Sequence, residues 1–73
     1  MGFTKINRGG IEMEKSIMIY DGDKFVMELV TVEVNGTTEY FIKKANYVRL
    51  ISCERYNMYI DLAKYAGYDI KED

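Results

Sequence analysis

The sequence predicts a small α+β protein: an antiparallel meander of three to four strands followed by one C-terminal helix that packs on the sheet. Three observations predict this fold. Residues 16–51 contain short runs of β-branched and aromatic residues separated by turn residues. The Asn35-Gly36 pair is a strong signal for a tight hairpin, because both turn positions need a positive φ. Residues 53–66 have helical periodicity and end before Gly67, a favoured helix-ending residue.

The strands follow one another through short turns. The expected strands are Ser16–Tyr20, Lys24–Val34, Thr37–Lys44 and Tyr47–Ile51. The Asn35-Gly36 turn predicts a register in which Val34 faces Thr37 and Glu28 faces Lys43, a pair of opposite charges.

The turn Asp21–Asp23 also places two carboxylates at i and i+2, as calcium loops do. It lacks the downstream ligands of such a loop, so we interpret it as a plain β-turn. No metal site and no cofactor are expected.

Both faces of the predicted sheet are largely apolar. Val30, Val32 and Phe41 share one face, and Leu29 and Ile42 share the other. An antiparallel sheet with one face in water would alternate cleanly between apolar and polar residues. We therefore expect something to cover at least part of the second face.

The helix is predicted over Cys53–Ala66, with Ser52 as its N-cap and Gly67 just beyond its end. A rival start at Asn46 is disfavoured, because the β-branched Val48 and the apolar alternation around it are typical of a strand. The polar tail of residues 69–73 is expected to fray.

Residues 1–12 show no periodicity and contain a Gly-Gly pair, so they are predicted to be a flexible N-terminal arm. The arm is interpreted as an extension upstream of the folded unit, with Met13 as an alternative native start. Residues 13–73 are expected to form a single small α+β domain.

The composition restricts the chemistry that the chain can perform. The chain has 73 residues, one cysteine, no histidine and a net charge of −2. These values exclude an internal disulfide and a histidine-based triad, and they disfavour a general nucleic-acid binder. Cys53 sits at a predicted helix start, which stabilises a thiolate, but a small buried hydrophobe is the preferred interpretation. We expect a non-enzymatic protein located in the cytoplasm.

The helix has more apolar surface than one contact with a sheet requires. Its apolar arc spans about 240°, whereas a core-facing helix needs little more than about 100°. Tyr56, Tyr59, Ile60 and Ala63 are predicted to face the sheet. The remaining side is predicted to be a protein interface, because tyrosine, methionine and arginine are enriched in interfaces. Its residues are Arg55, Met58, Leu62, Tyr65 and Tyr68.

Cations and aromatic residues alternate around the third and fourth strands. The residues are Tyr40, Lys43, Lys44, Tyr47 and Arg49. Aromatic rings stack on bases and cations bind phosphates, so this surface is the alternative candidate site, for nucleic acid or a nucleotide. The competing interpretation is a sheet edge whose charges prevent aggregation.

The segment Tyr47–Leu62 resembles the strand-then-helix element of Phd-type antitoxins, in which a Leu-Ile-Ser-x-Glu-x-Tyr string opens a helix. The matching residues are Leu50, Ile51, Ser52, Glu54 and Tyr56. That family would begin with a helix-rich DNA-binding segment, whereas this chain has a strong hairpin there. The chain is therefore not assigned to the family.

The favoured function is a small protein–protein interaction module that forms a homodimer or higher oligomer, or binds a host protein. Isoleucine, lysine, asparagine and tyrosine, whose codons are AT-rich, are abundant. This composition suggests a phage or mobile element, whose product would inhibit or modulate a host protein. The alternative is a dimeric nucleic-acid or nucleotide-binding regulator of the antitoxin kind.

Overall fold

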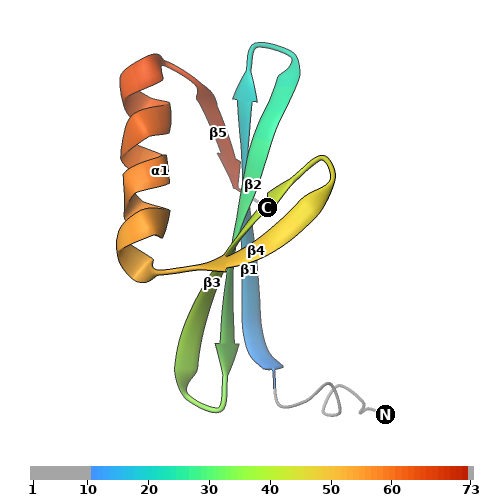
Figure 1. Cartoon of the computed structure of the whole chain (residues 1–73), viewed down its shortest axis with the longest axis vertical. Helices are drawn as coiled ribbons and strands as arrows, with labels where there is room; N and C mark the ends of the chain where they lie inside the picture. Colours follow the sequence, from blue (N-terminus) through green and yellow to red (C-terminus); the bar gives the residue numbers. More distant parts are fainter. Residues whose placement is uncertain (1–10, 73) are drawn as a thin grey trace.

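The computed structural model describes residues 11–72 as one antiparallel sheet with a helix on one face (Figure 1). The elements are β1 (Ile11–Asp21), β2 (Lys24–Val34), β3 (Thr37–Lys44), β4 (Tyr47–Ile51), α1 (Cys53–Ala66) and β5 (Asp69–Glu72). The strand order is β4-β3-β2-β1-β5. The predicted α+β meander with one packed helix is confirmed, with five strands where three to four were expected.

The β2–β3 hairpin has the predicted register. Val34 faces Thr37 and Glu28 faces Lys43, with every pair between them in step. Asn35 and Gly36 form the turn with φ values of 52° and 79°. The Asn-Gly pair adopts these values at little cost, and this local preference sets the alignment of both strands.

Strand β1 is longer than the Ser16–Tyr20 run that the sequence predicts. It begins at Ile11 and pairs with β2 from Ile11 to Asp21. Glu14 and Lys15 are exposed, and the apolar alternation in this part of the strand is limited to Ile11 and Met13. The backbone N–H and C=O groups of this part pair with those of the long strand β2. Residues 1–10 of the predicted arm lie outside the described residues, and the last two residues of the arm open β1.

The expectation that residues 69–73 fray is wrong for Asp69–Glu72, which form β5. This strand pairs with β1, with Tyr20 facing Asp69 and Ile17 facing Glu72. Ile70 packs against the core and anchors an otherwise polar segment to the edge of the sheet.

The boundaries of α1 are those that the sequence predicts. The Ser52 side-chain oxygen accepts a hydrogen bond from the backbone N–H of Arg55 at 3.1 Å. At the other end Gly67 has φ 80°, and the N–H of Tyr68 donates to the carbonyl of Ala63 at 2.9 Å. This arrangement is a Schellman motif, which turns the chain back toward the edge of β1. No helix within residues 11–72 is both long and apolar enough to cross a membrane.

The core lies between α1 and one face of the sheet. Its buried residues are Ile19, Leu29, Ile42 and Ala63. Tyr56, Tyr59 and Ile60 pack against this cluster from the helix, as predicted. On the opposite face Val30 is buried beside its cross-strand partner Phe41. No element within residues 11–72 lies over that second face (Figure 1).

Candidate interaction surfaces

The outward side of α1 carries large apolar side chains in solvent. Met58 is 42 % exposed, Leu62 53 % and Tyr65 92 %. Their neighbour in sequence, Ala63, is 2 % exposed because it points into the sheet. The helix therefore buries one apolar side and presents another, as the width of the apolar arc predicts.

An apolar groove of about 340 Å³ lies between the C-terminal half of α1 and the start of β2. It is lined by Val26, Met27, Tyr59, Leu62, Ala63, Tyr65, Ala66 and Tyr68. Three of the predicted interface residues, Leu62, Tyr65 and Tyr68, thus meet in one depression. No charged residue lines it, so an occupant would remove mainly apolar surface from water.

Arg55 and Met58, the other two predicted interface residues, do not line this groove. Arg55 lies in the first turn of the helix and lines a different pocket beside β4. Met58 is exposed on α1 without lining either depression. The structure therefore divides the predicted stripe into a groove-lining part and a part near the helix N-terminus.

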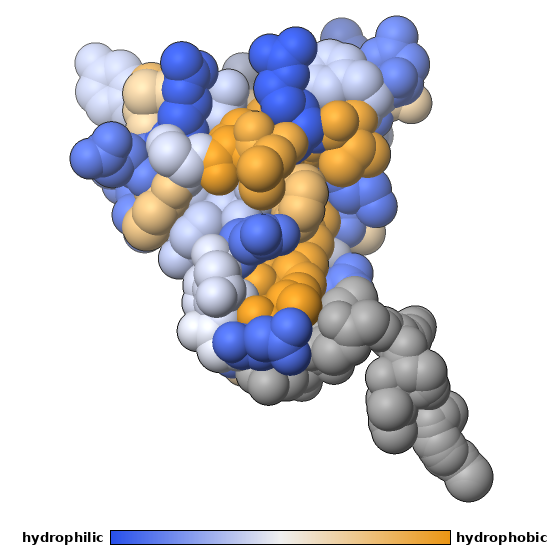
Figure 2. Space-filling view, turned by 60° about the horizontal axis from the view of Figure 1, so that its bottom comes forward, coloured by the Kyte–Doolittle hydropathy of each residue, from blue (hydrophilic) through white to orange (hydrophobic). Residues whose placement is uncertain are grey.

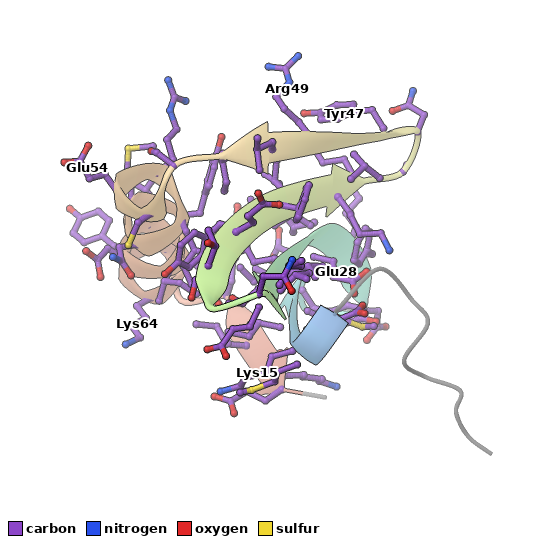
Figure 3. All side chains as sticks on the ribbon, turned by 90° about the horizontal axis from the view of Figure 1, so that it is seen from below. Lys15, Glu28, Tyr47, Arg49, Glu54 and Lys64 are labelled. Atoms are coloured by element: carbon purple, nitrogen blue, oxygen red, sulfur yellow. The ribbon has the colours of Figure 1, made fainter. Side chains whose placement is uncertain are left out.

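The second pocket has a volume of about 390 Å³ and lies between β4 and the N-terminal turn of α1. It is lined by Ile42, Tyr47, Arg49, Leu50, Ile51, Ser52, Arg55 and Tyr59. The Arg49 guanidinium lies 5.5 Å from the centre of the Tyr47 ring. Two arginines and no carboxylate line this pocket, so it favours a negatively charged group. Figure 3 shows Arg49 and Tyr47 projecting from β4, away from the other strands.

The alternative nucleic-acid surface is only partly brought together. Lys44, Tyr47 and Arg49 share the helix-side face, because Lys44 pairs with Tyr47 and side chains alternate along each strand. Lys43 is on the opposite face, where its Nζ lies 3.9 Å from the Glu28 carboxylate. That carboxylate also accepts a hydrogen bond of 2.7 Å from the Ser16 hydroxyl.

Tyr40, the remaining residue of that surface, lies under the helix. Its ring is 4.9 Å from the ring of Tyr56. A hydrogen bond with the Cys53 side chain, followed by partial burial, raises the pKa of Tyr40. Tyr40 therefore supports the helix start and is poorly placed to stack on a base.

The preferred interpretation of Cys53 as a buried hydrophobe is wrong, because the residue is exposed. It is the first residue of α1 and lies at the corner where the chain leaves β4. Its thiol accepts a weak hydrogen bond from the Asn57 amide at 3.7 Å. No base that would activate the thiol is among these contacts.

Two further exposed residues were not identified as site residues from the sequence. Val48 is 61 % exposed and Leu50 60 %, and both lie on the face opposite α1. Figure 2 shows hydrophobic residues gathered in a band that hydrophilic residues interrupt. The signal that could have found Val48 and Leu50 was the apolar character of both faces of the sheet.

Comparison of the chain with protein-family models, curated proteins and solved structures finds no match. The arguments on function therefore depend on the surfaces described above.

Proposed function

We propose that the protein is a small, non-enzymatic protein–protein interaction module whose main binding surface is the apolar groove beside α1. The observation that carries the proposal is the convergence of Leu62, Tyr65 and Tyr68 on one uncharged depression. Leu62 is more than half exposed and Tyr65 is almost completely in solvent, whereas Tyr68 is partly buried against the core. Aromatic side chains that are free to fill a partner's pockets are typical anchors of protein interfaces.

The small size of the core supports the same proposal. Among residues 13–72, the buried apolar side chains are Ile19, Leu29, Val30, Ile42 and Ala63. Domains of this length bury a limited fraction of their surface and gain stability from association. A partner that binds only the folded state adds its binding free energy to that stability. The occupant is a host protein or a second copy of the chain.

The biological setting that we propose is a phage or mobile element acting in the cytoplasm of its host. The abundance of isoleucine, lysine, asparagine and tyrosine, whose codons are AT-rich, supports this origin. In that setting the groove would bind a host protein and inhibit or modulate it.

A second candidate function is a nucleic-acid or nucleotide-binding regulator. The pocket beside β4 supports it, because Arg49, Arg55 and Tyr47 meet there without an acidic residue. The separation of Lys43 onto the other face and the net charge of −2 count against an extended phosphate-binding surface.

The test compares the wild-type chain with Leu62→Asp, which places a charge in the groove. Immobilised wild-type protein should retain a partner, or self-associate in sedimentation velocity, and the variant should lose at least about 2 kcal/mol of binding free energy. Asp61→Asn is the matched control, because Asp61 is the exposed residue before Leu62 and does not line the groove. Equal loss of binding by both variants, or a fall in thermal stability that matches the fall in binding, would contradict the proposal.

A further inference from the structure

Strand β4 is a free edge of the sheet. Within the described residues it pairs with β3 on one side and with nothing on the other. In an antiparallel ladder about every second residue exchanges its backbone hydrogen bonds with the one neighbour. The alternate residues of Tyr47–Ile51 therefore direct their N–H and C=O groups outward, where another extended chain could pair with them.

The two edges of the sheet differ in how they are protected. At the β5 edge three of the four residues, Asp69, Lys71 and Glu72, are charged. At the β4 edge Arg49 is the only charge among five residues, and its neighbours Val48 and Leu50 are both more than half exposed. Charges on edge strands discourage pairing with other chains, so β4 is the edge more open to such pairing.

The two faces of β4 have different chemistry. Val48 and Leu50 give the face opposite α1 an apolar character. On the helix side Arg49 and Arg55 line a pocket without carboxylates, and neither arginine forms an ion pair with a side chain of residues 13–72. Arginine guanidinium groups bind carboxylates through paired, charge-assisted hydrogen bonds.

We propose that β4 accepts an extended segment of a partner protein as an additional strand. Along this segment acidic residues alternate with apolar ones, so that its carboxylates meet Arg49 and Arg55 while its apolar side chains cover Val48 and Leu50. The inference rests on the proposed function, because it also treats the chain as a protein-binding module. It names a surface separate from the groove beside α1 and the kind of peptide that fits it.

The same pocket could attract a phosphate of a nucleic acid, but the structure favours a peptide. A peptide backbone satisfies the outward N–H and C=O groups of β4, which a sugar-phosphate backbone does not match. A peptide with period-two alternation also buries Val48 and Leu50 on the face that nucleic acid would leave in water.

The experiment uses a fluorescein-labelled peptide of about eight alternating valine and glutamate residues, long enough to pair along all of β4. Fluorescence anisotropy should show saturable binding to the full chain that weakens as salt is added. A peptide of the same composition with its valines and glutamates in two blocks should bind at least about tenfold more weakly. An alternating peptide with all its backbone amides N-methylated should lose binding to the same degree, because it has no N–H left to donate to the ladder.

A matched pair of charge reversals tests the position of the peptide. Arg49→Glu should weaken binding at least about tenfold, and Lys15→Glu, which changes the net charge equally, should leave it within about twofold. Lys15 lies on β1, which β2 and β3 separate from β4, and Figure 3 shows it far across the sheet from Arg49. Both residues are exposed, so neither change removes core contacts.

The outcomes separate this inference from the proposed function. Equal binding of the alternating, blocked and N-methylated peptides would overturn strand addition. So would stronger binding of a single-stranded oligothymidylate than of the alternating peptide. If the alternating peptide does not bind the wild-type chain while the groove still binds a partner protein, only the β4 site is rejected. Retention of peptide binding in Leu62→Asp would support a site distinct from the groove.

Discussion

The two sides of α1 carry similar residues in opposite environments. Toward the sheet, Tyr59 and Ala63 pack against the core cluster. Away from it, Leu62 and Tyr65 are exposed at 53 % and 92 %. The inner side explains why the helix docks on the sheet, since its burial removes apolar area from water. The outer side is mostly in solvent and contributes little to that docking, so we explain its apolar character by binding to a partner.

The largest expected effect comes from replacing a core leucine that the inner side of α1 covers. Leu29 is fully buried beneath the helix, and Leu29→Ala should lower the free energy of unfolding by about 3 kcal/mol. The loss combines transfer of the side chain to water with the cavity left between sheet and helix. Urea denaturation followed by circular dichroism measures it.

Leu62→Ala is the matched change on the outer side. It should alter the free energy of unfolding by less than about 0.5 kcal/mol, because the side chain is already more than half in solvent. Its effect should instead appear in partner binding. If Leu62→Ala destabilised the chain as much as Leu29→Ala does, the outer side would be core, and the contrast between the two sides would fail.

A smaller effect is expected from replacing Ser52, the N-cap of α1. Ser52→Ala removes the hydrogen bond of 3.1 Å to the N–H of Arg55 and should cost about 1 kcal/mol of unfolding free energy. It should also loosen the first turn, which carries Arg55. Asp61→Ala, an exposed change in the middle of α1, is the control, and urea denaturation compares the two. Equal losses would mean that the cap has no special role.

A still smaller change in unfolding free energy is expected from a substitution on the face of the sheet opposite α1. The Lys43 ammonium lies 3.9 Å from the Glu28 carboxylate, and the Lys43 side chain is 46 % exposed. Lys43→Ala should therefore change the unfolding free energy by less than about 1 kcal/mol, and salt should reduce that difference. A double-mutant cycle with Glu28→Gln measures the coupling. If the coupling energy between Lys43 and Glu28 did not change with salt, the pair would not be screened by solvent as we expect.

Much of this architecture could be predicted because its signals are local. The Asn35-Gly36 turn determines the register of two strands, and Ser52 and Gly67 mark the ends of the helix. The start of β1 and the whole of β5 could not be predicted in this way. Their residues are mostly polar, and they are strands because a neighbouring backbone is available to them. That availability is a property of the tertiary fold.

In the candidate site too, some features have local sequence signals and others depend on the tertiary fold. Helical periodicity alone predicts which side of α1 faces away from the sheet, and Leu62 and Tyr65 on that side are exposed. Strand alternation could also have separated Lys43 from Lys44, since adjacent residues point to opposite faces. The assignment of Arg55 to a pocket with Arg49 depends on where β4 meets the helix, which no local pattern specifies.

The smallest expected effect concerns Tyr40, beneath the helix start. Its pKa is raised by the Cys53 side chain and by partial burial, so the folded state favours the neutral hydroxyl. Up to about pH 10, the ordinary tyrosine value, this contribution to stability is complete. Above it the unfolded chain loses the proton first, and the contribution disappears as the pH passes the raised pKa of the folded state. Tyr40→Phe should therefore lose less stability between neutral and strongly alkaline pH than the wild type.

The involvement of Cys53 makes this prediction specific. In the wild type, Cys53→Ala should flatten the alkaline decline in unfolding free energy, measured by urea denaturation across the pH range. In the Tyr40→Phe background the same change should have no such effect, because the titrating hydroxyl is gone. Independent effects of the two changes would mean that the thiol does not act on Tyr40. Tyr40 would then contact α1 through the tilted Tyr40–Tyr56 ring pair, without a contribution from the thiol.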